Sequence, residues 1–186
     1  MVHTRDGRAG TESGIIGAMA DITDLIFADH EWFRRMFFYL DEATSEAELE
    51  AIWEPLATRL DTHAEAEELI FYPELLKRGE DDPVEETEDA IKDHNKIRDG
   101  IAEARRHPIG SEAWWKGVNT AREENGEHLD EEEREGLPDF RRRASVELRH
   151  QLAMRWLRFS FEHPAGKGID TSDRDVEEYL SENAPR

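Results

Sequence analysis

Histidine and glutamate recur in one spacing at two places in the chain. The segments that begin at His63 and His128 both read H-x3-E-E-x4-P, and they start 65 residues apart. An aspartate–histidine pair precedes each copy, and its histidines, His30 and His94, lie 64 residues apart. Imidazole and carboxylate together form the ligand set of redox-active transition metals in proteins. The repeat therefore predicts a metal site built from both halves of the chain.

Helix geometry explains why this spacing suits a metal. Residues four positions apart lie on the same helix face, so each histidine of the repeat projects with the glutamate that follows it. With the two upstream histidines, six side chains are expected to converge: His30, His63, Glu67, His94, His128 and Glu132. This set suits two metal ions, each bound by two histidines, with both carboxylates bridging. Each ion then keeps positions for a shared oxo, hydroxo or water ligand and for an exogenous ligand.

The alternative is that the pattern has no role in metal binding. A chain with 45 acidic residues offers many chance His-x3-Glu pairs, and a single pair is more often a solvated surface pair. Two copies in register favour the metal site, since burying four histidines and two glutamates without a metal would be costly. Imidazole and carboxylate without thiolate suit iron or manganese, with zinc less favoured. A structural bundle with incidental metal is a further alternative.

The composition narrows the classes of function. The length of 186 residues indicates one domain, and the net charge of −21 argues against binding to nucleic acid or to anionic membranes. The absence of cysteine excludes disulfides, zinc–thiolate sites and iron–sulfur clusters. The sequence has no apolar run long enough for a membrane span or a secretory signal, so we expect a cytoplasmic protein. The sequence does not indicate an oligomeric state.

The fold class expected from the sequence is all-α, because apolar residues recur at helical spacing and no hairpin signal occurs. Helices are expected at about 19–40, from about 46 to 78, at 84–106 and from 111 to about 138. Pro55 and Pro73 should kink or break the second of these. Each half then forms a helical hairpin, and two hairpins make an up-down four-helix bundle with inward-facing ligands.

The remaining segments are assigned by composition. Residues 1–18 are expected to form a flexible N-terminal tail, and residues 19–162 the helical bundle. The bundle includes an additional C-terminal helix over residues 139–161. Residues 163–186 are expected to form a polar C-terminal tail with a short helix around 176–180.

The combined pattern resembles the hemerythrin-like HHE cation-binding domain family, to which actinobacterial hemerythrin-like proteins belong. The resemblance covers about residues 21–142 and includes the sequence Glu-Glu-Leu-Ile-Phe-Tyr-Pro after the first copy's His-x3. It implies a four-helix bundle around two iron ions joined by an oxo or hydroxo bridge. It also implies that the four histidines are terminal ligands and that Glu67 and Glu132 are bridging carboxylates.

One departure from the family bears on function. Oxygen-carrying hemerythrins have a fifth histidine, four residues from the third-helix histidine, whereas Arg98 and Ala90 occupy those positions around His94 here. The resemblance therefore implies an open iron that reacts with hydrogen peroxide or O2, with catalase-like detoxification in oxidative stress as the leading hypothesis. The alternative is a module that binds, senses or stores O2, nitric oxide or iron without turnover.

Residues next to the six candidates receive weaker predictions. Arg34 and Arg98 are expected to form ordinary ion pairs at the rim, with tuning of a ligand as the alternative. Glu68 and Glu133 should face a neighbour or solvent, although either could hydrogen-bond a ligating imidazole, bind as an auxiliary ligand or act as a proton shuttle.

Three further residues are expected to face away from the site. Asp29 and Asp93 precede the upstream histidines and are expected to be solvated. Tyr72 lies nine residues after His63, nearly opposite on a regular helix, so it should not reach the metals unless the kink at Pro73 rotates it.

Overall fold

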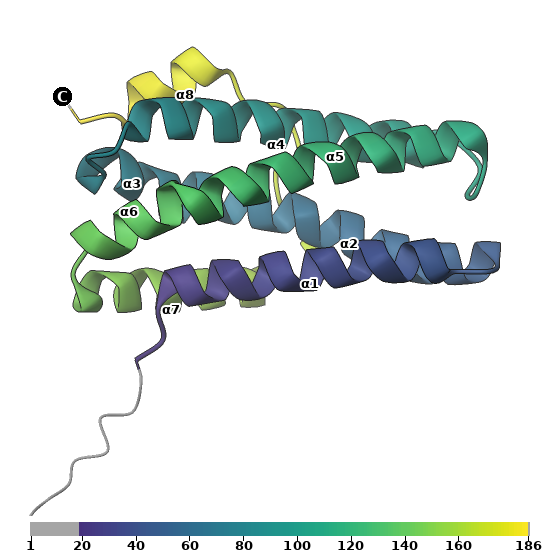
Figure 1. Ribbon diagram of the computed structural model, residues 1–186, viewed down its shortest axis with the longest axis horizontal. Coiled ribbons are helices and arrows are strands. Elements are labelled where there is room, and N and C mark those ends of the chain that lie inside the picture. Colours follow the sequence, from purple (N-terminus) through teal and green to yellow (C-terminus); the bar gives the residue numbers. More distant parts are fainter. Residues whose placement is uncertain (1–18, 186) are drawn as a thin grey trace, which may run out of the picture.

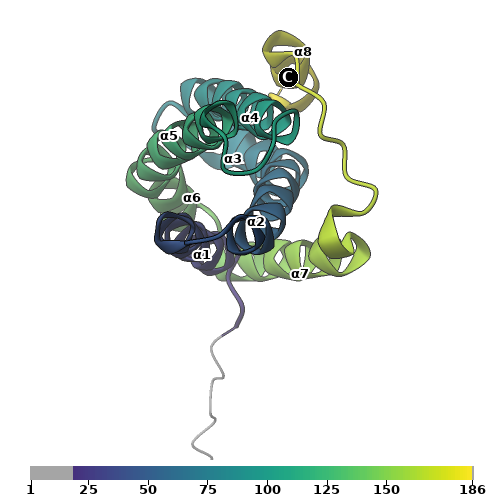
Figure 2. The ribbon, with the colours of Figure 1, turned by 90° about the vertical axis from the view of Figure 1, so that its right-hand side faces the viewer.

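A computed structural model describes residues 19–185 of the chain. Four long helices form its centre: α1 (Ile22–Glu42), α2 (Glu46–Ala66), α4 (Pro83–Arg105) and α5 (Glu112–Arg134). They run side by side, and an end-on view shows them as a ring (Figures 1 and 2). The described residues contain no strand, which confirms the all-α class. The N-terminal tail predicted over residues 1–18 lies outside this range.

Side-chain caps set the starts of three of the four bundle helices, α1, α2 and α5. The Asp21 side chain accepts a hydrogen bond from the Thr23 amide at the start of α1. Ser45 and Glu48 form the expected capping box at the start of α2. Ser111 accepts from the Trp114 amide at the start of α5. These bonds satisfy amides that the first helical turn leaves without partners.

The first H-x3-E-E-x4-P copy ends in a π-helix. After α2, Glu67–Phe71 form this π-helix, and α3 (Tyr72–Arg78) follows. The Tyr72 amide bonds the Glu67 carbonyl, five residues back. Pro73 has no amide hydrogen, so the regular ladder cannot continue past it. The break expected at Pro73 therefore takes the form of a one-residue bulge, whereas α2 continues through Pro55.

The second copy ends in a helix break instead. α5 stops at Arg134, and α6 (Gly136–Arg143) begins after one turn residue. The segment expected as one helix over residues 139–161 is two helices, because α7 (Val146–Glu162) starts anew. The Ser145 side chain accepts from the Leu148 amide and caps α7, a start signal that the helical composition of the segment obscured.

The short helix expected around residues 176–180 is present, and a further turn precedes it. A 3-10 turn (Pro164–Gly166) and α8 (Val176–Asn183) follow α7. α8 lies against the outer side of α4, while α7 covers α1 and α2 (Figure 2). No helix in this described part of the chain is long and apolar enough to cross a membrane.

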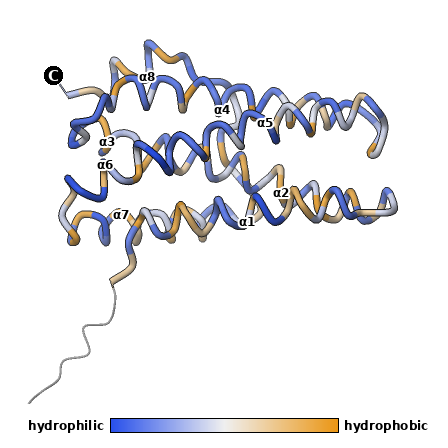
Figure 3. The backbone as a smooth tube through the Cα atoms, in the orientation of Figure 1, coloured by the Kyte–Doolittle hydropathy of each residue, from blue (hydrophilic) through white to orange (hydrophobic). Residues whose placement is uncertain are grey.

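Two buried apolar clusters lie on either side of the histidines along the bundle. In α1, Ile26 belongs to one cluster and Phe33 to the other, with His30 between them. In α4, Ile91 and Ile97 enclose the other upstream histidine in the same way. Hydrophobic and hydrophilic residues alternate along these helices (Figure 3). The polar site is therefore a layer inside the bundle, with apolar side chains above and below it.

Close contact between α4 and α5 depends on glycine. A methyl group added at Gly117 would collide with the backbone of Ala104, and one added at Gly100 would lie 2.6 Å from the Ala121 nitrogen. We expect Gly117→Ala to lower the free energy of unfolding by about 1–3 kcal/mol, because the two helices must move apart. Gly126→Ala is the control: nothing lies within 4 Å of its added carbon. That change should stabilise α5 by about 0.5–1 kcal/mol. Urea denaturation of the metal-free chain measures both, and equal effects would refute the close packing.

Candidate metal centre

The six side chains predicted from the repeat come together between the four long helices. His30, His63 and Glu67 form one group of candidate ligand atoms, and Glu67, His94 and His128 form a second. All of these side chains are buried. Glu67 belongs to both groups, as a bridging carboxylate would.

The two oxygens of Glu67 face different histidine pairs. Glu67 Oε1 lies 2.9 Å from His63 Nε2 and 4.0 Å from His30 Nε2. Glu67 Oε2 lies 3.2 Å from His94 Nε2 and 3.6 Å from His128 Nε2. The latter two nitrogens are 3.2 Å apart. Each pair thus presents two imidazole nitrogens and one carboxylate oxygen to the same small volume.

Glu132 is placed less symmetrically than its counterpart in the repeat. Its Oε2 lies 3.3 Å from His30 Nε2, while its Oε1 accepts a hydrogen bond of 2.9 Å from the Tyr72 hydroxyl. Tyr72 is fully buried and points into the site, contrary to the expectation for a regular helix. The π-helix before Pro73 adds one residue to the turn and rotates Tyr72 inward. Sequence reasoning identified this proline but not the direction of the rotation.

Unpartnered polar atoms test whether the site fits a metal. His30 Nε2, His63 Nε2, both oxygens of Glu67 and Glu132 Oε2 are buried and make no hydrogen bond of good geometry, although several of them lie within 4 Å of one another. Buried polar atoms are nearly always satisfied in folded proteins, so five exceptions facing one volume need an explanation. Metal ions bound between these atoms would satisfy all five at once. The donor set, imidazole with carboxylate and no thiolate, fits iron or manganese.

In three of the four histidines, a carboxylate contacts Nδ1, the ring nitrogen that faces away from the candidate metal positions. Asp29 Oδ2 lies 3.2 Å from His63 Nδ1, and Glu133 Oε1 lies 2.9 Å from His30 Nδ1. Glu68 Oε1 lies 3.0 Å from the Nδ1 of the third histidine, His94. Such carboxylates fix the ring orientation and leave Nε2 free for a metal. The part of the chain that the structure describes shows no such carboxylate contact for His128.

These contacts correct several predictions made for neighbouring residues. Asp29 is buried against His63 and Arg59, so it is not solvated. Arg98 is buried too and donates to Glu68, whereas an exposed rim pair had been expected. Arg34 does form a partly exposed pair, with Glu133, in agreement with the prediction.

Asp93 is placed differently from its counterpart Asp29. Its side chain is mostly buried, and its Oδ1 pairs with Lys96. The solvated position expected for Asp93 is therefore wrong as well, although it does not support a histidine.

Electrostatics keep the supporting carboxylates ionised. Partial burial opposes ionisation of Glu133, but His30 and Arg34 lower its pKa to about 2. Burial likewise opposes ionisation of Asp29, and the hydrogen bonds and charges of His63 and Arg59 lower its pKa. Burial disfavours the charged form of His63, yet Glu67 and Asp29 raise its pKa to about 10.

Metal binding should therefore release protons. With a pKa of about 10, His63 carries a proton at pH 7 in the metal-free chain, and a metal binds only the deprotonated nitrogen. Rising pH removes the competing proton, so we expect apparent affinity to increase between about pH 7 and about pH 10. Anaerobic calorimetry with iron(II) in buffers of different ionisation enthalpy measures the protons released. A binding heat that does not depend on the buffer would contradict this prediction.

A comparison with protein families adds to this geometry. The family model of the hemerythrin HHE cation-binding domain matches residues 21–139. The chain belongs to this family. No match was found among curated proteins or among solved structures. The resemblance drawn from the repeat is thus confirmed, and it marks this hemerythrin-family chain as a metal-binding protein.

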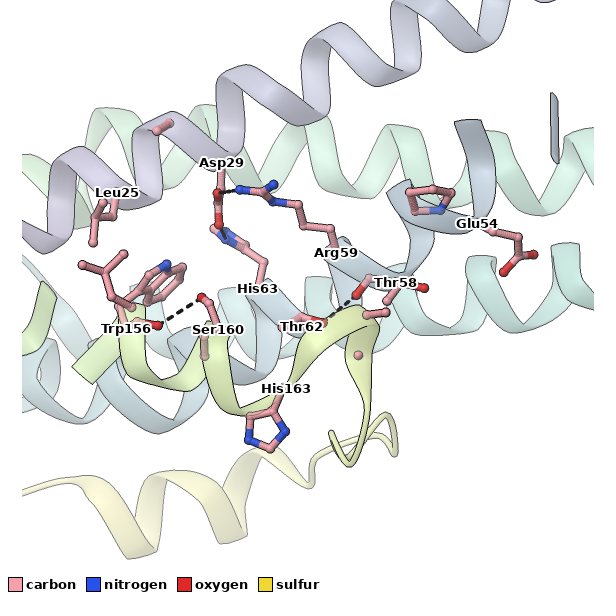
Figure 4. A pocket seen from close by; sticks show the side chains of 16 residues that line it. Leu25, Asp29, Glu54, Thr58, Arg59, Thr62, His63, Trp156, Ser160 and His163 are labelled. Atoms are coloured by element: carbon pink, nitrogen blue, oxygen red, sulfur yellow. Dashed lines mark hydrogen bonds and ion pairs between the residues drawn. The ribbon is translucent and has the colours of Figure 1, made fainter. Parts of the chain in front are cut away.

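A cavity of about 690 Å³ lies beside the site of this hemerythrin-family chain, between α1, α2 and α7. Asp29 and His63 line it together with Trp156, whose ring contacts the His63 ring edge-to-face at 5.3 Å (Figure 4). The cavity therefore extends to the Nδ1 side of the His63 ring, where Nδ1 contacts Asp29. The Nε2 atoms that face the candidate metal positions lie deeper in the bundle.

Proposed function

We propose that this chain holds a non-haem di-iron centre and that the centre disproportionates hydrogen peroxide. The observation that carries the proposal is the position of Glu67, whose two unpartnered oxygens face two separate pairs of histidines. One carboxylate between two imidazole pairs is the arrangement of a bridged metal pair. The proposed ligands are His30, His63, Glu67, His94, His128 and Glu132.

The bound iron pair would supply two one-electron redox centres. Two electrons taken from one peroxide molecule are passed to a second, so two hydrogen peroxide molecules become one O2 and two water molecules. Iron is proposed over manganese or zinc because the family model describes a hemerythrin domain and the donor atoms are nitrogen and oxygen.

The absence of a fifth histidine favours reaction over oxygen carriage. Arg98 and Ala90 occupy the two positions, four residues on either side of His94, where a fifth histidine is absent, and the Arg98 guanidinium donates to Glu68 at 2.8 Å. A metal held by the histidine pair of α4 and α5 would have fewer protein ligands than one in an oxygen carrier. A free position can admit a small oxidant such as peroxide.

Tyr72 can orient a substrate oxygen at this site. The Tyr72 hydroxyl donates to Glu132 Oε1, and burial together with the charge of Glu132 raises its pKa well above the usual value. The phenol therefore keeps its proton at neutral pH, and it can turn this proton from Glu132 to an oxygen of the substrate. The apolar clusters on both sides of this layer limit access of water.

Oxygen evolution from peroxide tests the proposal. The iron-loaded chain should release O2 in an oxygen-electrode assay, and His63→Ala should abolish that release. His107→Ala is the matched control, because the His107 side chain bonds Glu103 near a helix end and is not one of the proposed ligands. No O2 from an iron-loaded wild-type chain would refute the catalase-like reaction.

A binding or sensing role without turnover is the second candidate. It is favoured by the bond from Arg174, in the C-terminal region, to Glu68 behind His94. Through this connection the metal centre could affect the surface of the molecule. A change of the Arg174 region upon nitric oxide or O2 binding, in a chain that evolves no O2 from peroxide, would support this candidate over the first.

A further inference from the structure

The carboxylate of Glu68 contacts both the candidate metal centre and the C-terminal region. Only 2% of Glu68 is exposed. Its Oε1 meets His94 Nδ1 at 3.0 Å and accepts from Arg98 at 2.8 Å. Its Oε2 accepts from Arg174 Nε at 3.0 Å. The ring of His94 is therefore oriented by a carboxylate that two arginines hold in place.

The backbone of Glu68 is held by the same region. In the π-helix the carbonyl of Glu68 would pair with the amide five residues on, but that residue is Pro73, which has no amide hydrogen. The amide of Tyr72, its partner in a regular α-helix, bonds Glu67 instead. The hydroxyl of Tyr179 in α8 donates to the Glu68 carbonyl at 2.6 Å. Tyr179 thus satisfies an acceptor that the bulge and the proline leave without a helical donor.

Other bonds fix the C-terminal segment, residues 170–183, independently of Glu68. The Asn95 side chain donates to the Arg174 carbonyl and accepts from the Arg174 amide, both at 2.9 Å. The Asp170 amide donates to Glu65 Oε2 at 3.0 Å. α8 lies along α4, the helix that carries His94 (Figure 1). Because the backbone of the segment is held separately, losing the Arg174 side chain should not release the segment.

The repeat provides an internal comparison. Glu133 is the counterpart of Glu68 and supports His30, and Arg34 is the counterpart of Arg98. The side chain of Glu133 is 23% exposed, against 1% for Glu68. Within the described residues no second arginine from a distant segment reaches Glu133. The C-terminal segment therefore makes the two halves of the site unequal.

This segment lies beyond the part of the chain that the family model matches, which ends at residue 139. We propose that Arg174 and Tyr179 are positioning residues for the metal centre, which act through Glu68 on His94. This inference rests on the proposed di-iron centre. The metal bound by His94 and His128 then depends on the C-terminal segment, whereas the metal bound by His30 and His63 does not.

Iron release measures this difference. The full-length, iron-loaded chain is mixed with excess chelator, and the release of each iron is followed over time. Arg174→Gln should speed release of the iron at His94 and His128 about tenfold and leave release of the other iron unchanged. Tenfold is the lower end of the effect expected when a residue that supports a metal-binding histidine is lost. Tyr179→Phe should have the same effect to a smaller degree, and Arg174→Lys should restore part of the loss. Arg158→Gln is the control, because Arg158 is exposed and pairs only with Glu162.

Mössbauer spectra of the same proteins separate positioning from general loss of structure. In Arg174→Gln the signal of one iron site should shift while that of the other stays in place. Iron release at the wild-type rate in both Arg174→Gln and Tyr179→Phe would overturn the inference while leaving the di-iron centre intact. Equal acceleration of the release of both irons would do the same. A wild-type chain that binds no iron would overturn the proposed function and this inference with it.

Discussion

Replacing Glu67 by glutamine is expected to remove both irons from the chain. Among residues 19–185, Glu67 is the one carboxylate whose two oxygens face both histidine pairs, and neither oxygen has another partner there. Glutamine has the same shape but no charge, and its amide nitrogen cannot replace a carboxylate oxygen as a ligand. Metal analysis of the iron-loaded, desalted variant should find far less than one iron per chain, at an unchanged helical content.

Glu132→Gln serves as the matched comparison for this change. Glu132 approaches only His30, and its other oxygen is engaged by Tyr72. We therefore expect this variant to keep the iron of the His94 pair. Glu88→Gln, at an exposed pair with Lys92, should keep both. Two irons retained in Glu67→Gln would contradict the bridging role of this carboxylate.

Replacing Glu68 by glutamine is expected to have the largest effect on stability. Its carboxylate lies between two arginines, and one of them, Arg98, has a side chain only 3% exposed. Removing one partner of a buried ion pair leaves an uncompensated charge, which costs about 3–5 kcal/mol. Urea denaturation of the metal-free variant should show a loss of this order.

The counterpart in the repeat tests whether burial is the cause. Glu133 contacts a histidine and an arginine, His30 and Arg34, as Glu68 contacts His94 and Arg98, but it lies near the surface. Solvent screens its pair, so Glu133→Gln should cost only about 1 kcal/mol or less. Equal losses in the two variants would show that the arginines and burial around Glu68 have no special role.

The repeat was sufficient to predict much of the site. Because side chains four residues apart share a helix face, the spacing of His63 and Glu67 fixed their common direction once the segment was helical. The matching second copy and the two upstream histidines then required four helices around one point. The all-α class followed from the helical spacing of apolar residues and the family from the repeat, and the fold and the family comparison confirm both.

Other features depended on contacts that spacing does not contain. The inward position of Tyr72 results from the π-helix, whose extra residue changes the helical phase for everything that follows. Asp29 supports His63 on a different helix, and such a pairing between helices cannot be read from one helix at a time. The repeat did hold a signal, since Glu68 and Glu133 occupy matching positions and support histidines in the opposite hairpins.

The contacts of the C-terminal region with the bundle were not predicted, for a similar reason. Its polar composition suggested a tail, yet Arg174 and Tyr179 donate hydrogen bonds to buried groups of the bundle. Hydropathy measures the average preference of a segment for water. It does not register single polar side chains that satisfy a buried carboxylate or carbonyl.

The most direct test of the di-iron centre is a crystal structure of the iron-loaded chain with anomalous diffraction data collected on both sides of the iron absorption edge. We expect two iron peaks inside the bundle on either side of Glu67, one beside His30 and His63 and the other beside His94 and His128. A single peak, or iron bound only at surface carboxylates, would contradict this expectation.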